Sequence, residues 1–218
     1  MDKTVIVAGG TGGIGSSITK LLEKELINKL YIIGRDRNKF EKLNFKQNTC
    51  FLEINQNLIL PPHDIFINCV GAGYYSLSTE FNSKDLDKSY RDNLKIPMLL
   101  IKKSLNSFID NKIEGWIINI NSMAGLEGFY NGSLYSTFKF GLRGFLQVLR
   151  KENKRNNIRV SEIYPGIVDT KLSTKMPKKV KKECMIDPFQ IASVVENVIR
   201  NNLYVEKMVI KNDKIIWE

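Results

Sequence analysis

Short apolar segments alternate with longer amphipathic segments along the whole chain. The apolar segments are rich in Val, Ile, Phe and Tyr on consecutive positions, which is typical of strands buried on both faces. These predicted strands lie at residues 4–8, 30–33, 49–54, 64–70, 115–121, 158–164 and 208–211. Helical spacing of apolar residues predicts helices between them, at residues 14–25, 36–43, 83–109, 134–153 and 188–201.

The strict alternation of strands and helices predicts an α/β fold, a doubly wound parallel β-sheet flanked by helices on both faces. The length of 218 residues suits a single domain over residues 1–218. Residues 169–185 contain Pro177, many lysines and little periodicity, so we expect a loop or lid over about residues 169–187. Asn212 and Asp213 separate two apolar segments and predict a small hairpin, with residues 214–217 as the returning strand.

Composition excludes several classes of protein. Hydrophobic residues make up 43% and charged residues 26% of the chain, the balance of a globular protein. No apolar run approaches the roughly 18–20 residues that span a bilayer, and the first one is too short for a signal peptide. Three cysteines without paired spacing and a single histidine argue against a disulfide framework and a metal cluster. We therefore expect a cytoplasmic, metal-free protein with no membrane partner.

The net charge of +10 comes mostly from lysines that are dispersed along the chain. A dispersed excess does not form a nucleic-acid footprint, so we do not expect nucleic acid as a partner. One dense cluster lies in the predicted lid and consists of Lys175, Lys178, Lys179, Lys181 and Lys182. This cluster is either a solvated loop or a surface for an anionic substrate or carrier protein.

The first predicted strand runs into a glycine-rich loop, and a helix follows directly. Five of the seven residues 9–15 are glycine. A phosphate binds against backbone N–H groups at a helix N-terminus, and side chains in the loop would hold it away. The order of strand, glycine loop and helix predicts a Rossmann-like dinucleotide site.

The end of the second predicted strand indicates which dinucleotide binds. Sites that prefer NAD place a carboxylate there to hold the adenosine ribose hydroxyls. Here that position is Gly34, and Arg35 follows it. Because a guanidinium can bind the 2′-phosphate of NADP, the sequence favours NADP(H) over NAD(H).

A second group of chemically active residues follows the fifth predicted strand. Ser122 ends this strand, and Tyr135 comes thirteen residues later. Lys139 lies four positions beyond Tyr135, so the two side chains share one helix face. A free tyrosine has a pKa near 10, which a neighbouring ammonium and a positively charged nicotinamide ring would lower. Tyr135 is therefore a candidate general acid or base.

In combination, these motifs resemble the short-chain dehydrogenase/reductase family. The glycine loop of the family, T-G-x-x-x-G-x-G, matches residues 8–15 with Ala8 in place of threonine. Its N-N-A-G segment is similar to residues 68–71, and its P-G-x-x-x-T segment to residues 165–170. The helical asparagine, serine, tyrosine and lysine of the family correspond to Asn93, Ser122, Tyr135 and Lys139.

The resemblance implies a division of labour among the four catalytic positions. Tyr135 would give a proton to the substrate carbonyl oxygen, and Ser122 would fix that oxygen by a hydrogen bond. Lys139 would hold the nicotinamide ribose and lower the pKa of Tyr135. Asn93 would support a water molecule that links Lys139 to solvent.

The resemblance also implies the residues that hold the cofactor. The glycine loop would bind the pyrophosphate, residues at strand ends would bind the adenosine, and the segment after the sixth strand would meet the nicotinamide. The full set is Gly9, Thr11, Gly12, Gly13, Ile14, Gly15, Arg35, Glu53, Asn68, Gly71, Tyr135, Lys139, Pro165, Gly166, Val168 and Thr170.

The sequence thus predicts an oxidoreductase that transfers a hydride between NADP(H) and a small carbonyl or alcohol substrate, as a carbonyl reductase. Two alternatives stay open: a 3-oxoacyl-thioester reductase acting on carrier-protein or CoA substrates, and a non-catalytic NADP(H)-sensing regulator. In this family the substrate pocket is shaped by segments that correspond to residues 126–134 and 171–187. The resemblance further implies a homodimer or homotetramer, assembled through the predicted helices at residues 92–109 and 134–153.

Overall fold

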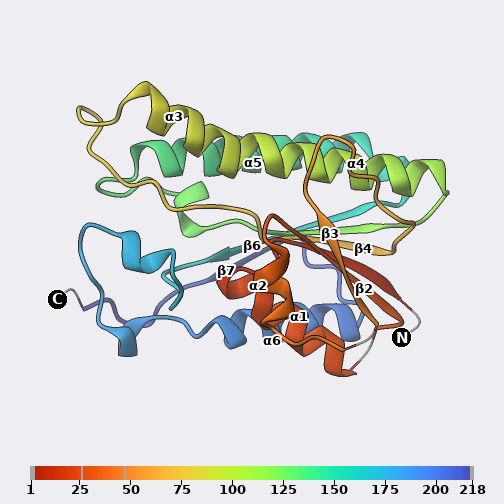
Figure 1. Ribbon diagram of the computed structural model, residues 1–218. Helices are drawn as coiled ribbons and strands as arrows, with labels where there is room; N and C mark the ends of the chain where they lie inside the picture. Colours follow the sequence, from red (N-terminus) through yellow and green to blue (C-terminus); the bar gives the residue numbers. More distant parts are fainter. Residues whose placement is uncertain (1–2, 26, 47, 217–218) are drawn as a thin grey trace.

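The centre of the molecule is one seven-stranded sheet (Figure 1). The computed structural model describes residues 3–25, 27–46 and 48–216. All neighbouring strands are parallel, in the order β3-β2-β1-β4-β5-β6-β7. The strands are β1 Thr4–Ala8, β2 Lys29–Gly34, β3 Thr49–Glu53, β4 Ile65–Asn68, β5 Trp116–Ile120, β6 Arg159–Pro165 and β7 Lys207–Ile210. The direction of strand succession reverses between β1 and β4, which is where a doubly wound sheet binds its ligand.

Helices cover both faces of this sheet, as the alternation of patterns predicts. The helices are α1 Gly13–Glu25, α2 Arg37–Glu41, α3 Ser83–Tyr90, α4 Ile96–Asp110, α5 Ser133–Glu152 and α6 Pro188–Arg200. Figure 1 shows α3, α4 and α5 on one face, and α1 with α6 on the other. The predicted doubly wound α/β fold is confirmed.

Side chains of the central strands alternate between two hydrophobic cores. Val5 and Val7 of β1 pack in the core that includes Ile18 of α1 and Val195 of α6. Ile6 points the other way, into the core formed with α4 and α5. Because both faces of these strands are buried, they have no solvent-facing side for polar residues. Apolar residues therefore occupy consecutive positions in the sequence.

The predicted helix at residues 83–109 is continuous but contains one irregular turn. Residues Arg91–Lys95 form a π-helical turn between α3 and α4, in which the Ile96 N–H donates to the Arg91 carbonyl. Pro97 in the first turn of α4 has no N–H to donate to the Asn93 carbonyl four residues earlier. Such turns recur at functional sites, and this one contains Asn93 and Asp92.

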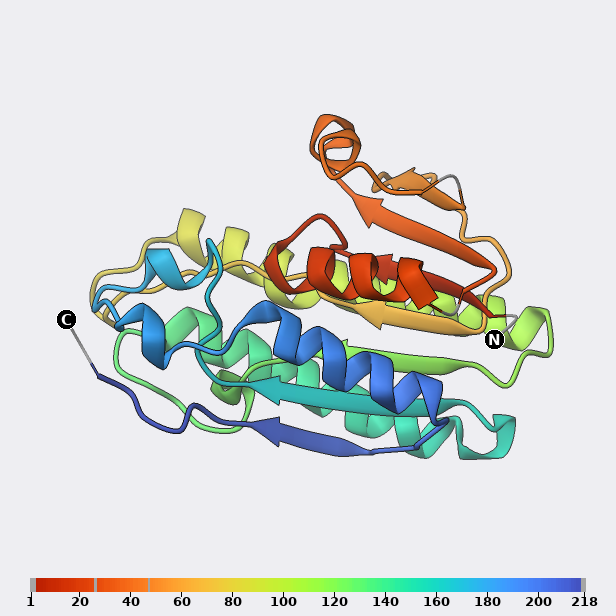
Figure 2. The same ribbon diagram turned by 90° about the horizontal axis from the view of Figure 1, so that it is seen from below.

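The predicted C-terminal hairpin is wrong. Residues 214–216 form no strand, whereas residue 217 of the predicted strand lies outside the described residues. Figure 2 shows the chain running on past the end of β7 rather than back along it. The Asn212 side chain bonds both the N–H and the carbonyl of Ile167, at 2.8 and 2.9 Å, and also the Cys184 carbonyl. These contacts tie the segment to the lid, and the Lys181 N–H donates to the Ile216 carbonyl.

The lid at residues 169–187 is folded rather than an unstructured insert. It contains two 3₁₀ turns, Ser173–Lys175 and Lys182–Cys184, and Val168 pairs with Ile186 at its base. Among the helices in the described part of the chain, none is long and apolar enough to cross a membrane.

Candidate active site

A cavity of about 450 Å³ opens at the carboxyl ends of the central strands. It is bounded by the turn after β4, the end of β5, the start of α5, the segment after β6 and the lid. Ser122, Tyr135 and Lys139 all line it. The three residues that are separated in the sequence are therefore brought together in one cavity.

Tyr135 and Lys139 lie one helical turn apart in α5 and are almost fully buried. The Lys139 ammonium lies 5.7 Å from the centroid of the Tyr135 ring. Ser122 caps the short 3₁₀ turn Met123–Gly125, and its Oγ accepts from the Ala124 N–H at 3.1 Å. This turn packs on α5, which fixes Ser122 beside the tyrosine.

Burial dominates the ionisation of Tyr135 in the free protein. Loss of hydration raises the pKa of Tyr135 to about 12, although a hydrogen bond with Ser122 acts in the opposite direction. The physical reason is that a phenolate in a dry cavity loses its hydration. The expected lowering of this pKa by Lys139 and a positively charged nicotinamide ring together concerns the protein with its cofactor bound and stays a prediction.

Burial also perturbs Lys139, and it lowers the pKa of its ammonium to about 8. Among the described residues, its Nζ makes no hydrogen bond or ion pair and lies over the Tyr135 ring. A buried ammonium without a hydrogen-bond acceptor is costly unless a ligand supplies oxygen atoms. Lys139 is thus suited to hold hydroxyl groups of a molecule bound in the cavity.

Asn93 ties the π-helical turn to the turn after β4. Its Oδ1 accepts from the Ala72 N–H at 3.0 Å, and its Nδ2 donates to the Ala72 carbonyl at 2.9 Å. Gly71 stands between Asn93 and Lys139, because a Cβ there would lie 3.2 Å from the Asn93 Oδ1 and 3.1 Å from the Lys139 Nζ. The predicted catalytic asparagine and lysine therefore face each other across a glycine.

The glycine loop approaches its neighbours more closely than side chains allow. Gly9 has φ +76°, a left-handed conformation that favours glycine, and its N–H donates to the Ile33 carbonyl at 2.8 Å. A Cβ at Gly15 would lie 2.3 Å from the Gly9 carbonyl oxygen, and one at Gly13 would lie 2.4 Å from a Thr170 side-chain carbon. The open backbone at the start of α1 fits a pyrophosphate, and the unpartnered Lys139 fits ribose hydroxyls.

Most other predicted cofactor residues lie around this loop. Ile14, Pro165, Gly166, Val168 and Thr170 line the cavity, whereas Thr11 and Gly12 lie in the loop itself. Arg35 and Glu53 are exposed and follow or end the strands β2 and β3. Arg35 and Glu53 do not line the cavity, so their contact with a cofactor stays a prediction.

Asn68, another predicted cofactor residue, lies inside the sheet rather than in the cavity wall. Its side chain is fully buried and donates to the Asn119 Oδ1 at 2.7 Å. Its Oδ1 accepts from the Val70 N–H at 3.3 Å. Asn68 therefore joins β4 to β5 and shapes the following turn, and it does not line the cavity.

The substrate end of the cavity includes residues that the motifs do not reveal. Tyr75 and Phe129 surround the Tyr135 ring, with centroids 5.6 and 6.4 Å away. Within the segments 126–134 and 171–187, which are expected to shape the pocket, Phe129, Leu172 and Met176 line the cavity, but Leu126 and Tyr130 do not. The only sequence signal for Tyr75 is its position a few residues after the Gly71 turn.

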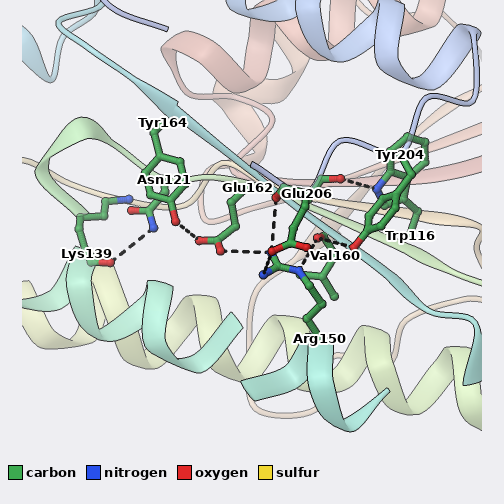
Figure 3. A network of polar contacts seen from close by, with 10 residues as sticks. Trp116, Asn121, Lys139, Arg150, Val160, Glu162, Tyr164, Tyr204 and Glu206 are labelled. Atoms are coloured by element: carbon green, nitrogen blue, oxygen red, sulfur yellow. Dashed lines mark hydrogen bonds and ion pairs between the residues drawn. The ribbon is translucent and has the colours of Figure 1, made fainter. Parts of the chain in front are cut away.

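A buried polar network supports the catalytic side of α5 (Figure 3). The Asn121 Nδ2 donates to the Lys139 carbonyl at 3.4 Å. Next to it, the Tyr164 hydroxyl donates to Glu162 at 2.5 Å, and Arg150 pairs with the same carboxylate at 3.3 Å. Burial raises the pKa of Glu162, which the Tyr164 hydrogen bond and the Arg150 charge oppose. The network connects β5, β6 and α5 beneath the site.

Comparison with known proteins agrees with this geometry. The family model described as short chain dehydrogenase matches residues 50–181. The 3-oxoacyl-[acyl-carrier-protein] reductase FabG of Rickettsia conorii is 30% identical over 191 residues, which cover 83% of this chain and 78% of the reductase. The chain therefore belongs to the short-chain dehydrogenase family and is an oxidoreductase of that family.

Solved structures share the fold at lower sequence identity. An alcohol dehydrogenase of the archaeon Thermococcus sibiricus, complexed with 5-hydroxy-NADP, superimposes with a TM-score of 0.82 at 20% identity, covering 98% of this chain and 97% of its own. A 4-hydroxyisoleucine dehydrogenase complexed with NADH gives a TM-score of 0.81 at 20% identity, covering 97% and 98%. Since one fold binds either nicotinamide cofactor in these two proteins, the fold by itself does not select between them.

Proposed function

We propose that this protein is an NADP(H)-dependent reductase of carbonyl compounds. The observation that supports it best is the meeting of Ser122, Tyr135 and an unpartnered, buried Lys139 in one cavity. This cavity adjoins the glycine loop, through Ile14 at the start of α1. The dinucleotide supplies the hydride for the carbonyl carbon when it is bound.

In this mechanism two hydroxyl groups act on the substrate oxygen. Ser122 donates a hydrogen bond to the carbonyl oxygen and holds it next to the phenol. Tyr135 gives its proton to the same oxygen as negative charge develops there. General acid catalysis of this kind contributes about 10²- to 10⁴-fold to a rate.

Lys139 and Asn93 restore the proton and position the cofactor. The Lys139 ammonium binds the ribose hydroxyls of the nicotinamide half and stabilises the phenolate left on Tyr135. Asn93 faces Lys139 across Gly71. Its position suits the support of a water molecule that returns a proton to Lys139.

Arg35 and the absence of an acid at Gly34 support the choice of NADP(H). The Arg35 side chain is 68% exposed after β2, where a guanidinium can reach a 2′-phosphate. The next acid, Asp36, accepts a hydrogen bond from the Lys39 N–H as the N-cap of α2. It is therefore engaged and does not take the place of the usual ribose-binding carboxylate.

Arg35→Ala tests this assignment. We expect NADPH to bind about tenfold more weakly to this variant, because a charge-assisted contact to the phosphate is lost. Affinity for NADH should change by less than about twofold. Thermal-shift titration with NADPH, NADH, NADP+ and NAD+ measures both effects through ligand-linked stabilisation. Equal weakening of both cofactors, or of neither, would contradict the role of Arg35.

A second candidate function is reduction of 3-oxoacyl groups on an acyl carrier protein. The reductase of Rickettsia conorii, 30% identical, is named for this substrate. The lid adds a physical argument, since Lys175, Lys178 and Lys179 are exposed next to the cavity wall at Met176. Such a surface complements an acidic carrier protein, while Leu172 and Met176 suit its acyl chain.

Combined substitution Lys178→Glu and Lys179→Glu tests this second candidate. We expect KM for a 3-oxoacyl carrier protein to rise roughly tenfold, because these charges steer an acidic partner. KM for a small 3-oxoacyl N-acetylcysteamine thioester should stay within about twofold. Lys151→Glu with Lys154→Glu, at the far end of α5, is the matched control of net charge. An equal change for both substrates would argue against carrier recognition.

We propose that the protein assembles as a homodimer or homotetramer through α4 and α5. Leu99 and Ile109 of α4 and Phe140 and Val148 of α5 are 40–52% exposed. Large apolar side chains on a helix surface mark contact sites when they gather on adjoining helices. The expected partner is therefore a second copy of the chain.

A further inference from the structure

An ion pair joins two segments at the carboxyl edge of the sheet, where the sequence predicts the adenosine end of the cofactor site. The Arg35 Nη1 lies 3.7 Å from the Asp92 Oδ1. Arg35 follows β2, whereas Asp92 lies in the π-helical turn that packs on the segment after β4. In the sheet, β1 lies between β2 and β4, and its carboxyl end opens into the glycine loop. The pair thus spans the point where the strand order reverses.

Asp92 is a built-in carboxylate rather than a surface acid. It is 5% exposed, and it accepts hydrogen bonds from the Tyr74 hydroxyl at 2.8 Å and the Arg91 Nε at 2.9 Å. Burial acts to raise the pKa of Asp92, but these hydrogen bonds and the charges of Arg91 and Arg35 outweigh it and lower the pKa. Asp92 is therefore ionised near neutral pH and keeps a negative charge beside the cleft.

We propose that Asp92 is a specificity-determining residue that competes with the 2′-phosphate of NADP(H) for Arg35. In the free protein Asp92 holds the guanidinium across the cleft, and the phosphate takes over this guanidinium when the cofactor binds. The inference rests on the proposed use of NADP(H) and assigns the strength of that preference to a second residue.

The transfer of Arg35 from Asp92 to the 2′-phosphate is favourable, because neither Arg35 nor Asp92 is left without a partner. Arg35 is largely solvated and linked only at 3.7 Å, so it can turn towards the cleft without losing a buried contact. When Arg35 leaves, Asp92 keeps its hydrogen bonds from Tyr74 and Arg91. No buried charge loses all of its partners, which is the costly outcome in other buried ion pairs.

The charge of Asp92 also acts on the phosphate directly. A carboxylate near the same guanidinium repels a phosphate that carries up to two negative charges. The adenosine without its 2′-phosphate does not meet this repulsion. Removing the charge at Asp92 should therefore strengthen binding only of ligands that carry the 2′-phosphate.

Isothermal titration calorimetry with adenosine 2′,5′-bisphosphate and adenosine 5′-phosphate tests the proposal without any turnover. We expect Asp92→Asn to bind the bisphosphate about three- to tenfold more tightly, with 5′-phosphate binding within about twofold of the original protein. The gain should shrink in 0.5 M salt, because exposed charges are screened. Asp87→Asn removes an equal charge from an exposed position of α3 and should change neither affinity.

The Arg35→Ala background separates the inference from the proposed function. In that background Asp92→Asn should give a clearly smaller gain, because the competition for Arg35 is absent and only the direct repulsion of the phosphate is removed. If the original protein prefers the bisphosphate and Asp92→Asn leaves its affinity unchanged or weaker, the role of Asp92 is overturned while the cofactor assignment stands. If the original protein shows no preference and Arg35→Ala has no effect, both are overturned. Should Asp92→Asn fail to fold, Asp92→Ser replaces it with the same expectations.

Discussion

Tyr135→Phe is expected to lower turnover of a carbonyl substrate by about 10²- to 10⁴-fold, the range that general acid catalysis contributes. The variant lacks only the hydroxyl that delivers the proton. The ring keeps its contacts with Tyr75 and Phe129, so the cavity should keep its shape. Affinity for NADPH should stay within about twofold, since the phenol is not part of the phosphate or adenosine contacts.

Turnover and cofactor binding are measured on the same preparation, by NADPH consumption and by thermal shift. Tyr130→Phe is the matched control, because Tyr130 is 76% exposed and does not line the cavity. Undiminished turnover of Tyr135→Phe would contradict a role of Tyr135 as the proton donor. An unaltered biological function with no turnover in the original protein would instead favour the NADP(H)-sensing regulator.

Lys139→Met is expected to lower turnover by about 10²-fold or more and to stabilise the free protein. Burial lowers the pKa of Lys139 to about 8, so the charged side chain opposes folding below that pH. A difference of this size from the usual lysine value near 10.4 corresponds to about 3 kcal/mol. An apolar side chain of similar length removes this cost, so the free energy of unfolding at pH 7 should rise by up to that amount.

The stability difference between Lys139→Met and the original protein should depend on pH. The unfolded chain binds a proton at Lys139 up to a higher pH than the folded chain does, so the original protein gains stability as pH rises from about 8 towards 10. The advantage of Lys139→Met should therefore shrink over the same range. Urea unfolding at pH 7 and pH 10 measures it, with Lys179→Met on the exposed lid as control. A destabilised variant at pH 7 would show that Lys139 contributes more contacts than its burial suggests.

The fold could be predicted because the sheet is buried on both faces. Consecutive apolar residues mark β1 and β4 to within a few positions, since helices from both layers cover them. The prediction of a hairpin after β7 was wrong because contacts between distant segments decide the structure there. Its turn residues resemble a local signal, but Asn212 is used for contacts with Ile167 and Cys184, which are far away in the sequence. Such long-range contacts cannot be recognised in the sequence pattern around Asn212.

The same distinction holds in the candidate site. Ser122, Tyr135 and Lys139 could be predicted together because strand ends and helix starts meet at one edge of a parallel sheet. Two other contacts could not be predicted. Arg35 pairs with Asp92, and Asn121 bonds the Lys139 carbonyl of α5. Both contacts join distant segments through side chains, and the spacing of residues in the sequence does not reveal them. The raised pKa of Tyr135 is also a property of the folded environment, because it comes from burial.

Transfer of deuterium from NADPH that carries two deuterium atoms at C4 of the nicotinamide tests the proposed activity most directly. The labelled cofactor is incubated with ketones, aldehydes and 3-oxoacyl thioesters, and the alcohols formed are analysed by mass spectrometry. The proposed function predicts one deuterium on the carbinol carbon, formed by the original protein and lost with Tyr135→Phe. NADPH binding without labelled alcohol from any of these compounds would contradict it.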